Sequence, residues 1–377
     1  MTASTANSPS LEHQILEGVT KLLDDYAAVK ADDVCLIAYS PDTRAYAAHI
    51  QVALTLRGMR AKAFAMRPFI DPEVRDKLHA LLTPPHELTG KLIIFTMERD
   101  SMSHYDVFAE LLTMYPKNQL KIMRIISASD ELFTTAFNKT PRELALRNAT
   151  LLSKIKQESR IRVTTPQGTD LDIELDHDKF DWISNRGAWR PGAFTILPAG
   201  EIASYPANVN GVLVADGALN ANVATRMDMR LEHNPLTITI KDSVAGDYEC
   251  SDPEITRLVE GCFNRENGRN IGELGFGTNN ATQEFVADNS HMNERFPSLH
   301  LGFGQHNQPE TIVPYVAEIH LDVITNDADI YFPNADETIR MSNFVPIPGI
   351  EHPVLIRDQD ITGDCCTRGC APRLKLA

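Results

Sequence analysis

The stretch "DVCLIAY" at 33–39 is a short apolar run, and "TRAYAAHIQVALTLRGM" at 43–59 follows it with apolar residues at helical spacing. A buried strand followed by an amphipathic helix is the unit from which parallel sheets are built. A further helical pattern precedes this unit at 11–30. More strand-like runs follow it, at 61–67, 91–97 and 120–127. The sequence therefore predicts an α/β fold that opens with an N-terminal α/β domain containing a mainly parallel sheet.

The loops that follow these strands lack the glycines of a phosphate-binding loop. After Ser40 the chain continues as "PDTRAYAAH", which matches neither G-x-G-x-x-G nor the P-loop pattern. A nucleotide-binding role for this domain therefore has no support in the sequence.

The second half of the chain is dominated by strand signals. A long helix is expected at about 130–158, with Thr140 and Glu143 as a capping box. From 159 to 175 the apolar period changes to two around a "PQGT" turn, which predicts a hairpin. Strand patterns then continue to the end, interrupted by a helical stretch at 252–263.

These patterns predict two domains. Residues 1–158 would form the N-terminal α/β domain, with residues 1–10 as a disordered arm. Residues 159–377 would form a larger α+β C-terminal metal-binding domain that is rich in strands. No repeat and no low-complexity linker separates the two parts.

Composition excludes several classes of partner. The chain has 36 basic and 51 acidic residues, a net charge of −15, whereas nucleic acid and anionic membranes both reward a basic surface. No apolar run approaches the ~18–20 residues of a membrane span, and the polar N-terminus does not resemble a secretory signal. Three of the six cysteines crowd into "DCCTRGC" at 364–370, without the spacing of a zinc site. We expect a cytoplasmic protein.

Near the end of the chain, "AEIHLDVI" at 317–324 places His320 and Asp322 two residues apart, so that both project from the same face of a strand. Three other acidic or imidazole side chains also stand in glycine-rich or apolar surroundings. They are Glu201 in "LPAGEIASYPANVNG" (197–211), Glu273 in "NIGELGFGTN" (270–279) and His300 in "LHLGFGQHN" (299–307).

Three carboxylates and two imidazoles are costly to bury unpaired, and one or two divalent ions would satisfy all five. Histidine nitrogen mixed with carboxylate oxygen is the ligand set expected for Zn, Mn, Co or Fe. Taken singly, each residue has an ordinary alternative, as a solvated charge, a core histidine or one half of a buried ion pair.

The second half of the chain resembles the M29 family of metallo-aminopeptidases, of the aminopeptidase T type. The matching segments are "PAGEIASYPANVNGVLV", "NIGELGFGTN", "LHLGFG" and "IHLDVI". The resemblance implies a hydrolase for an amide or N-terminal peptide bond of a small-molecule or peptide substrate, and a homodimer. It implies two divalent ions (Zn, Co or Mn), and it makes Glu273 and Glu201 the candidate catalytic residues. The implied metal ligands are Glu201, Glu273, His300, His320 and Asp322.

The chain departs from that family at two places. The family has a catalytic tyrosine seven residues after the histidine that matches His300, and here Asn307 stands in its place. Tyr315 and His306 are the nearby candidates to replace it. The segment before His300, "MNERFPSLH", differs from the acidic-Lys pattern of the family, and its nearest basic residue is Arg295.

A second resemblance leads to a different chemistry. The iron(II) ring-cleaving dioxygenases that act on 2,5-dihydroxypyridine have a similar "His-Leu-Asp" strand, followed by "CDIYL" where this chain has "ADIYF" at 328–332. This resemblance implies one Fe(II) ion bound by Glu273, His320 and Asp322. A third hypothesis is a non-catalytic descendant that binds a peptide or a partner protein. The hydrolase is preferred because all five hydrolase-type ligands are present.

Overall fold

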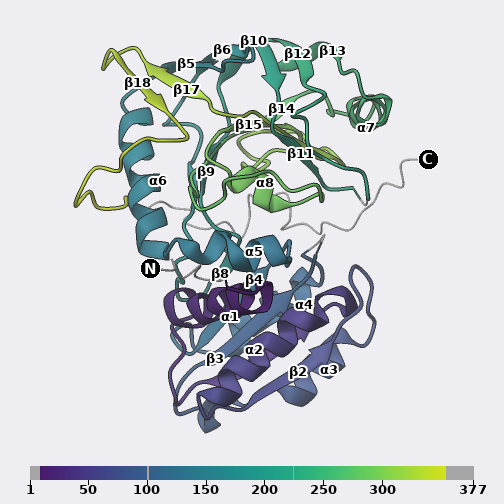
Figure 1. Ribbon diagram of the computed structural model, residues 1–377, viewed down its shortest axis with the longest axis vertical. Coiled ribbons are helices and arrows are strands. Elements are labelled where there is room, and N and C mark those ends of the chain that lie inside the picture. The colour runs from purple at the N-terminus through teal and green to yellow at the C-terminus, as the bar shows by residue number, and fades with distance from the viewer. Residues whose placement is uncertain (1–8, 100–101, 224, 354–377) are drawn as a thin grey trace, which may run out of the picture.

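The computed structural model describes residues 9–99, 102–223 and 225–353. Figure 1 shows a layered part, which contains the first helices and β1–β4, below a part that is rich in strands. Most of the expected arm at 1–10 and the whole "DCCTRGC" segment lie outside the described residues. Of the arm, Ser10 is described, and its hydroxyl accepts a hydrogen bond from the His13 N–H to cap α1 (Leu11–Lys21).

The first sheet is parallel throughout and has the strand order β2-β1-β3-β4-β8. Its strands are β1 (Val34–Tyr39), β2 (Ala61–Ala65), β3 (Leu92–Met97), β4 (Leu120–Ile125) and β8 (Phe194–Leu197). Both faces are buried, as expected for a parallel sheet. Cys35 and Ile37 of β1 pack toward α1 and α2 (Arg44–Leu56), whereas Leu36 and Ala38 pack toward α3 (Val74–Leu81) and α4 (Tyr105–Met114). The predicted α/β fold with a parallel sheet is therefore confirmed.

The last strand of this sheet comes from beyond the expected domain boundary. β8 pairs in parallel with β4, with Ile122 opposite Phe194, although it lies well after residue 159. The chain thus returns to the first sheet before it enters the strands of the site. The boundary between 158 and 159 stays a prediction.

The prediction of one long helix at about 130–158 is wrong in one respect, because the structure has three separate segments there. These are α5 (Asp130–Thr134), a 3-10 turn η4 (Ala136–Asn138) and α6 (Pro141–Ile155). The interruption has a local cause, since Pro141 starts a new helix and lacks the N–H that a continuous helix would need. The Thr140–Glu143 capping box is present in full.

Two antiparallel sheets form the rest of the chain. The seven-stranded sheet has the order β13-β12-β10-β6-β5-β17-β18, and the six-stranded sheet has the order β11-β16-β15-β14-β9-β7. The first contains β5 (Arg160–Thr164), β6 (Asp170–Glu174), β10 (Asn208–Ala215), β12 (Leu236–Lys241), β13 (Val244–Glu249), β17 (Asp329–Phe332) and β18 (Glu337–Arg340). The second contains β7 (Ile183–Asn185), β9 (Glu201–Ser204), β11 (Ala218–Ala221), β14 (Ile271–Gly277), β15 (Leu299–Gly304) and β16 (His320–Ile324).

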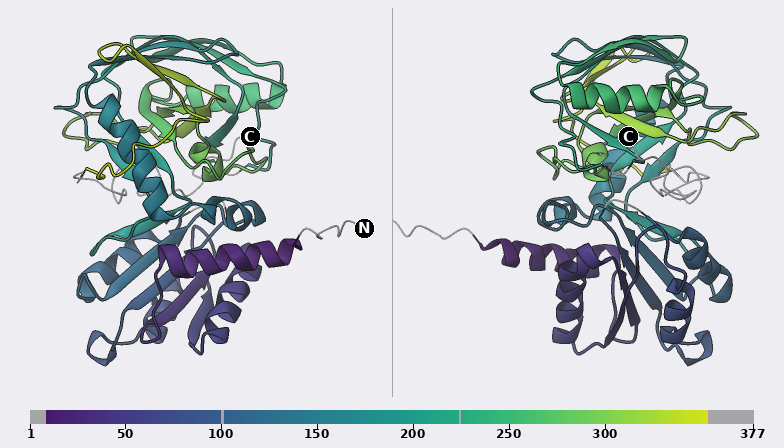
Figure 2. Two further views of the ribbon diagram at one scale, coloured as in Figure 1. Left: turned by 60° about the vertical axis from the view of Figure 1, so that its left-hand side comes forward. Right: turned by 90° about the vertical axis from the view of Figure 1, so that its right-hand side faces the viewer.

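The hairpin predicted at 159–175 is the pair β5–β6, and the helix predicted at 252–263 is α7 (Pro253–Phe263). A single apolar core joins the two antiparallel sheets, α6 and α7. Figure 2 shows the two sheets stacked above the layered part, with α6 along one side. From the six-stranded sheet this core takes every second residue, among them Leu274, Leu301 and Leu321. The alternate residues of the same strands therefore point away from the core.

Among the described residues, no helix combines the length and the apolar character that crossing a bilayer requires.

Candidate metal centre

The side chains predicted to carry the chemistry lie on the face of the six-stranded sheet that points away from the core. β14, β15 and β16 are neighbours, and their register places Glu273 opposite Gly302, which lies opposite Asp322. Glu201 is the first residue of β9 and lies opposite Gly277 of β14. Polar residues from four strands that are far apart in sequence therefore lie on one surface.

Glycines on the neighbouring strands make the room for these side chains. His300 lies opposite Gly275, and His320 lies opposite Gly304. A Cβ atom added at Gly275 would lie 1.9 Å from His300 Nε2, which shows that the imidazole ring rests directly over that backbone. Any larger residue there would displace the ring.

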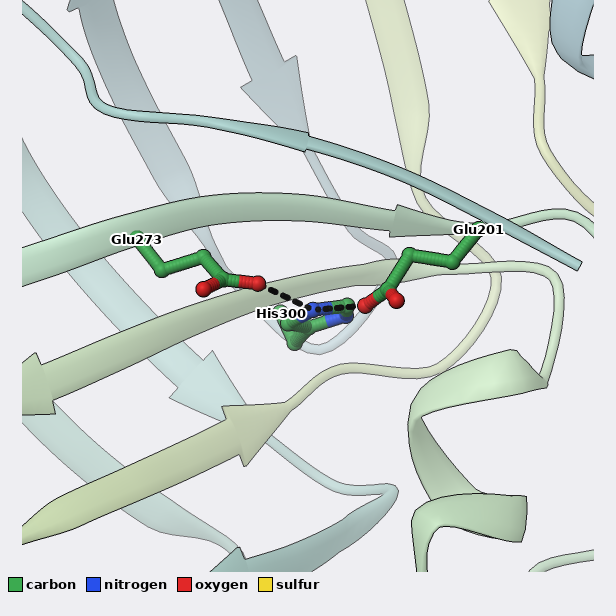
Figure 3. A group of neighbouring side chains, drawn as sticks. All are labelled: Glu201, Glu273 and His300. Atoms are coloured by element: carbon green, nitrogen blue, oxygen red, sulfur yellow. Dashed lines mark ion pairs between the residues drawn. The ribbon is translucent and has the colours of Figure 1, made fainter. Parts of the chain in front are cut away.

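Three of the predicted ligands form a compact group. Within the described residues, Glu201, Glu273 and His300 each bring a ligand atom within 4.8 Å of the other two. His300 Nε2 lies 3.0 Å from Glu201 Oε1 and 3.8 Å from Glu273 Oε1, as Figure 3 shows. The side chains of His300, Glu201 and Glu273 are 1%, 8% and 11% exposed, so the whole group is buried.

The donor set of this group fits a divalent ion. Neither ring nitrogen of His300 has a hydrogen-bond partner of good geometry within the described residues, although both are buried. A buried imidazole without such a partner, facing two carboxylates across a space cleared by glycine, has the composition of a metal site with one nitrogen and two oxygen ligands.

The other two predicted ligands, His320 and Asp322, pair with each other. His320 Nε2 lies 2.9 Å from Asp322 Oδ1, and its Nδ1 lies 2.7 Å from the carbonyl oxygen of Gln305. They are not part of the compact group of three. The five-residue ligand set of the sequence analysis therefore stays a prediction. In the structure three of these residues form the compact group, and the other two contact each other.

Two residues of the site come from the short helix α8 (His291–Arg295), which contacts β11, β14 and β16. The Arg295 guanidinium contacts the carboxylate of Glu201 through Nη1, and the same nitrogen lies 3.0 Å from Glu294 Oε2. Its Nε donates a hydrogen bond to the carbonyl oxygen of Pro198, at 3.1 Å. The Asn220 amide of β11 donates to Glu294 Oε1.

Burial and the neighbouring charges shift the pKa values of the site. Burial opposes protonation of His300, but its contacts with Glu201 and Glu273 outweigh burial and raise its pKa to about 10. Burial raises the pKa of Glu273, and it raises that of Glu294 well above the usual range. Burial would raise the pKa of Asp322, yet the charge of His320 outweighs it and holds that pKa below its usual range. Protons therefore neutralise part of the negative charge of the buried carboxylates, and a bound metal ion would displace these protons.

The candidate replacements for the family tyrosine make other contacts. Asn307 is fully buried, and its side-chain oxygen accepts a hydrogen bond from Gln308 at 2.7 Å. The Tyr315 hydroxyl donates to the carbonyl oxygen of Gly304, and the His306 ring bonds through Nε2 to the carbonyl oxygen of Tyr315. None of these side chains belongs to the compact group of three.

Nothing in the sequence indicates a role for Asn220, and Arg295 is notable there only as a departure from a family pattern. One signal was available in "HMNERF", where two adjacent opposite charges stand in a short segment directly before the apolar strand of His300. Their burial could not be read from that pattern.

Solved structures with the same fold include two enzymes. 2,5-Dihydroxypyridine dioxygenase from Pseudomonas putida KT2440 superposes with a TM-score of 0.57 at 15% identity, over 90% of this chain and 99% of that one. AmpT from Thermus thermophilus superposes with a TM-score of 0.54 at 10% identity, over 88% of this chain and 98% of that one. The chain thus has the fold of AmpT and of a dioxygenase, combined with a buried group of residues that could hold a metal ion.

The sequence itself points to a particular family. The family model described as crocagin biosynthetic protein CgnE/B matches residues 133–329, which is just over half of the chain. The chain belongs to this family. No curated protein sequence matches it.

Proposed function

We propose that the protein is a metal-dependent hydrolase that cleaves an amide or N-terminal peptide bond of a small-molecule or peptide substrate, in the biosynthesis of crocagin or a related compound. One divalent ion would be held by Glu201, Glu273 and His300. The observation that carries the proposal is the compact group itself, in which the buried His300 imidazole faces two carboxylates and its Nε2 lies 3.0 Å from one of them. The fold shared with AmpT and the match to a biosynthetic family support it.

A divalent ion at this position would supply Lewis-acid chemistry, which lowers the pKa of water and polarises a carbonyl group. The residues of the chain have separate tasks. His300 and Glu201, whose side chains lie 3.0 Å apart, would fix the position of the ion. Glu273, whose carboxylate lies 3.8 Å from His300 Nε2, would accept a proton from the attacking water. The oxygen of that water joins the acyl carbon, the C–N bond breaks, and Glu273 returns the proton to the leaving amine.

Metal content tests this proposal directly. Protein purified without chelator should hold one equivalent of Zn, Mn or Co per chain by elemental analysis, and His300→Ala and Glu201→Ala should lose it. His177→Ala is a matched control, because His177 is a partly buried histidine outside the compact group, bonded to Trp182 and to the Glu158 carbonyl oxygen. Retention of the metal by both site variants would contradict the proposal.

A second candidate function is a dioxygenase with one Fe(II) ion. A Cβ atom at Gly302 would lie 2.8 Å from His320 Cε1, 2.9 Å from Asp322 Oδ1 and 2.9 Å from the Cβ of Glu273, so these three side chains surround one point. Histidine and carboxylate are both ligands of non-haem iron, although its usual oxygenase site has two histidines and one carboxylate. One iron per chain that persists in His300→Ala and Glu201→Ala and disappears in Asp322→Ala would favour this candidate.

The third hypothesis, a non-catalytic peptide- or protein-binding descendant, gains some support from the ion pair between Arg295 and Glu201, which partly satisfies the site without a metal. The absence of metal from every preparation in metal-supplemented buffer would favour it. The homodimer stays an expectation from the resemblance, and light scattering coupled to gel filtration would test it.

A further inference from the structure

Arg295 is a permanent positive charge inside an otherwise acidic cluster. Its side chain is 1% exposed, and its guanidinium lies between the carboxylates of Glu201 and Glu294. Arginine stays protonated in proteins, so its charge does not depend on the state of its neighbours. The bond from its Nε to the carbonyl oxygen of Pro198 anchors it to the turn that leads into Glu201.

This placement engages both oxygens of Glu201. Oε2 contacts the Arg295 guanidinium, and Oε1 lies 3.0 Å from His300 Nε2. A carboxylate that bridges two metal ions offers one oxygen to each of them. Glu201 therefore has one oxygen left for a metal, on the side of His300, and the other is committed to a cation that the chain itself provides.

The same helix also reaches the side of the site where a second ion would bind. Glu294, next to Arg295, lies close enough to Asp322 for the charge of Asp322 to raise its pKa, and it accepts a hydrogen bond from Asn220. Glu294 and Arg295 thus connect Asp322 of one potential ion position to Glu201 of the other. A second dication would have to enter beside the guanidinium, against the repulsion of like charges in a buried setting.

We infer that the Arg295 guanidinium takes the place of a second divalent ion and restricts the centre to one metal, held by Glu201, Glu273 and His300. His320 and Asp322 then stay bonded to each other and bind no metal ion while the guanidinium is present. This inference rests on the proposed function, because it presupposes that the first ion binds. Arg295 is a residue that determines the stoichiometry of the site.

The test counts metal ions in charge-changing and charge-preserving variants. Wild type, Arg295→Lys and Arg295→Gln are loaded with Zn²⁺ or Mn²⁺, freed of excess metal by gel filtration and measured by elemental analysis. We expect one ion per chain in wild type and in Arg295→Lys, and two in Arg295→Gln. Adding Asp322→Asn to Arg295→Gln should return the count to one.

Arg147→Gln is the matched control for removal of a buried arginine. The Arg147 guanidinium donates to the carbonyl oxygens of Thr278 and Phe344, and no carboxylate contact is recorded for it among the described residues. Its count should stay at one ion. Circular dichroism and thermal unfolding show whether each variant is folded. For wild type, anomalous X-ray scattering gives an independent result, with one peak expected beside His300.

The outcomes separate the inference from the proposed function. One ion in wild type and still one in folded Arg295→Gln would overturn the inference and leave the metal site intact. Two anomalous peaks in wild type would also overturn it, even if Arg295→Gln does not fold. No metal in wild type would instead overturn the proposed function, and the inference with it.

Discussion

Gly275→Ala is a minimal substitution that should disrupt the metal centre, because Gly275 lies directly under the His300 ring. The added Cβ would lie 1.9, 2.4 and 2.6 Å from three atoms of the His300 ring, whereas ordinary contact begins near 3.4 Å. The deficit of about 1.5 Å is too large for a small shift of the ring, so the imidazole has to leave its position over the β14 backbone. Gly275 does not have a positive φ, so the substitution adds no backbone strain of that kind.

Two magnitudes follow from this geometry. Overpacking a core position costs about 1–3 kcal/mol, which is less than the ~5–15 kcal/mol that holds a typical domain together, so the fold should survive. Misorienting a metal-ligating residue by changing its support typically costs ~10–100-fold in metal affinity. Displacement of His300 removes one of three ligands, so we expect a loss at the upper end of that range or beyond it.

Titration calorimetry with Zn²⁺, together with thermal unfolding of the metal-free protein, measures both quantities. Gly246→Ala is the control, because Gly246 is also a strand glycine, its added Cβ would meet only a threonine hydroxyl closer than 3.4 Å, and it lies on the exposed surface of β13. Zn²⁺ affinity of folded Gly275→Ala equal to that of wild type would refute the assignment of His300 as a ligand.

Three further predictions concern other parts of the structure. Asn148→Ala should lower the stability by about 1–3 kcal/mol in a denaturant titration, because the Asn148 amide donates from α6 to the backbone oxygen of Glu201 and is fully buried. Asp216→Asn should raise the unfolding temperature at pH 7, because burial raises the pKa of Asp216. Ionisation of this carboxyl group therefore costs stability above its folded pKa, and the difference should vanish below about pH 4, where both states are protonated. Burial raises the pKa of the Cys35 and Cys262 thiols to about 12, so neither should react with iodoacetamide at pH 8 until the protein unfolds, as peptide mapping would show.

The fold was largely predictable because its signals are local. The strands β1, β3 and β4 of the parallel sheet are short, mainly apolar runs, because they are buried on both faces, whereas the edge strand β2 is largely exposed. β8 shows the limit of this reasoning. Its four residues have no signal that distinguishes pairing with β4 from pairing with the later strands, because strand order is decided by contacts distant in sequence.

The candidate site was predictable where its residues stand on strands. In "EIHLDVI" the alternation of side chains places His320 and Asp322 on one face, and their contact at 2.9 Å agrees with that placement. The roles of Glu294 and Arg295 were not predictable in the same way. They lie on a five-residue helix whose amphipathic pattern is too short to assign a face, and only the packing of that helix against the sheet buries them.

The glycines explain how a sheet can carry so polar a face. Along "IGELGFG" and "LHLGFG" the residues of one face include Leu274, Phe276 and Leu301, which pack into the core, while the other face of each strand carries one polar residue followed by two glycines. Each glycine removes the side chain that would fill the space beside its neighbour on the next strand, at the entropic cost that glycine brings to a strand. The entropic destabilisation by glycine is offset only where the space beside it is filled by a group larger than a methyl group. The His300 imidazole lies above Gly275, and the backbone of Glu294 and Phe296 lies against Gly277, next to the Arg295 whose guanidinium contacts Glu201. The imidazole and the guanidinium bring metal affinity or positive charge to buried carboxylates. The glycines and the charged residues therefore depend on each other. A substitution at either kind of position should change cation binding as well as stability, and both should be measured.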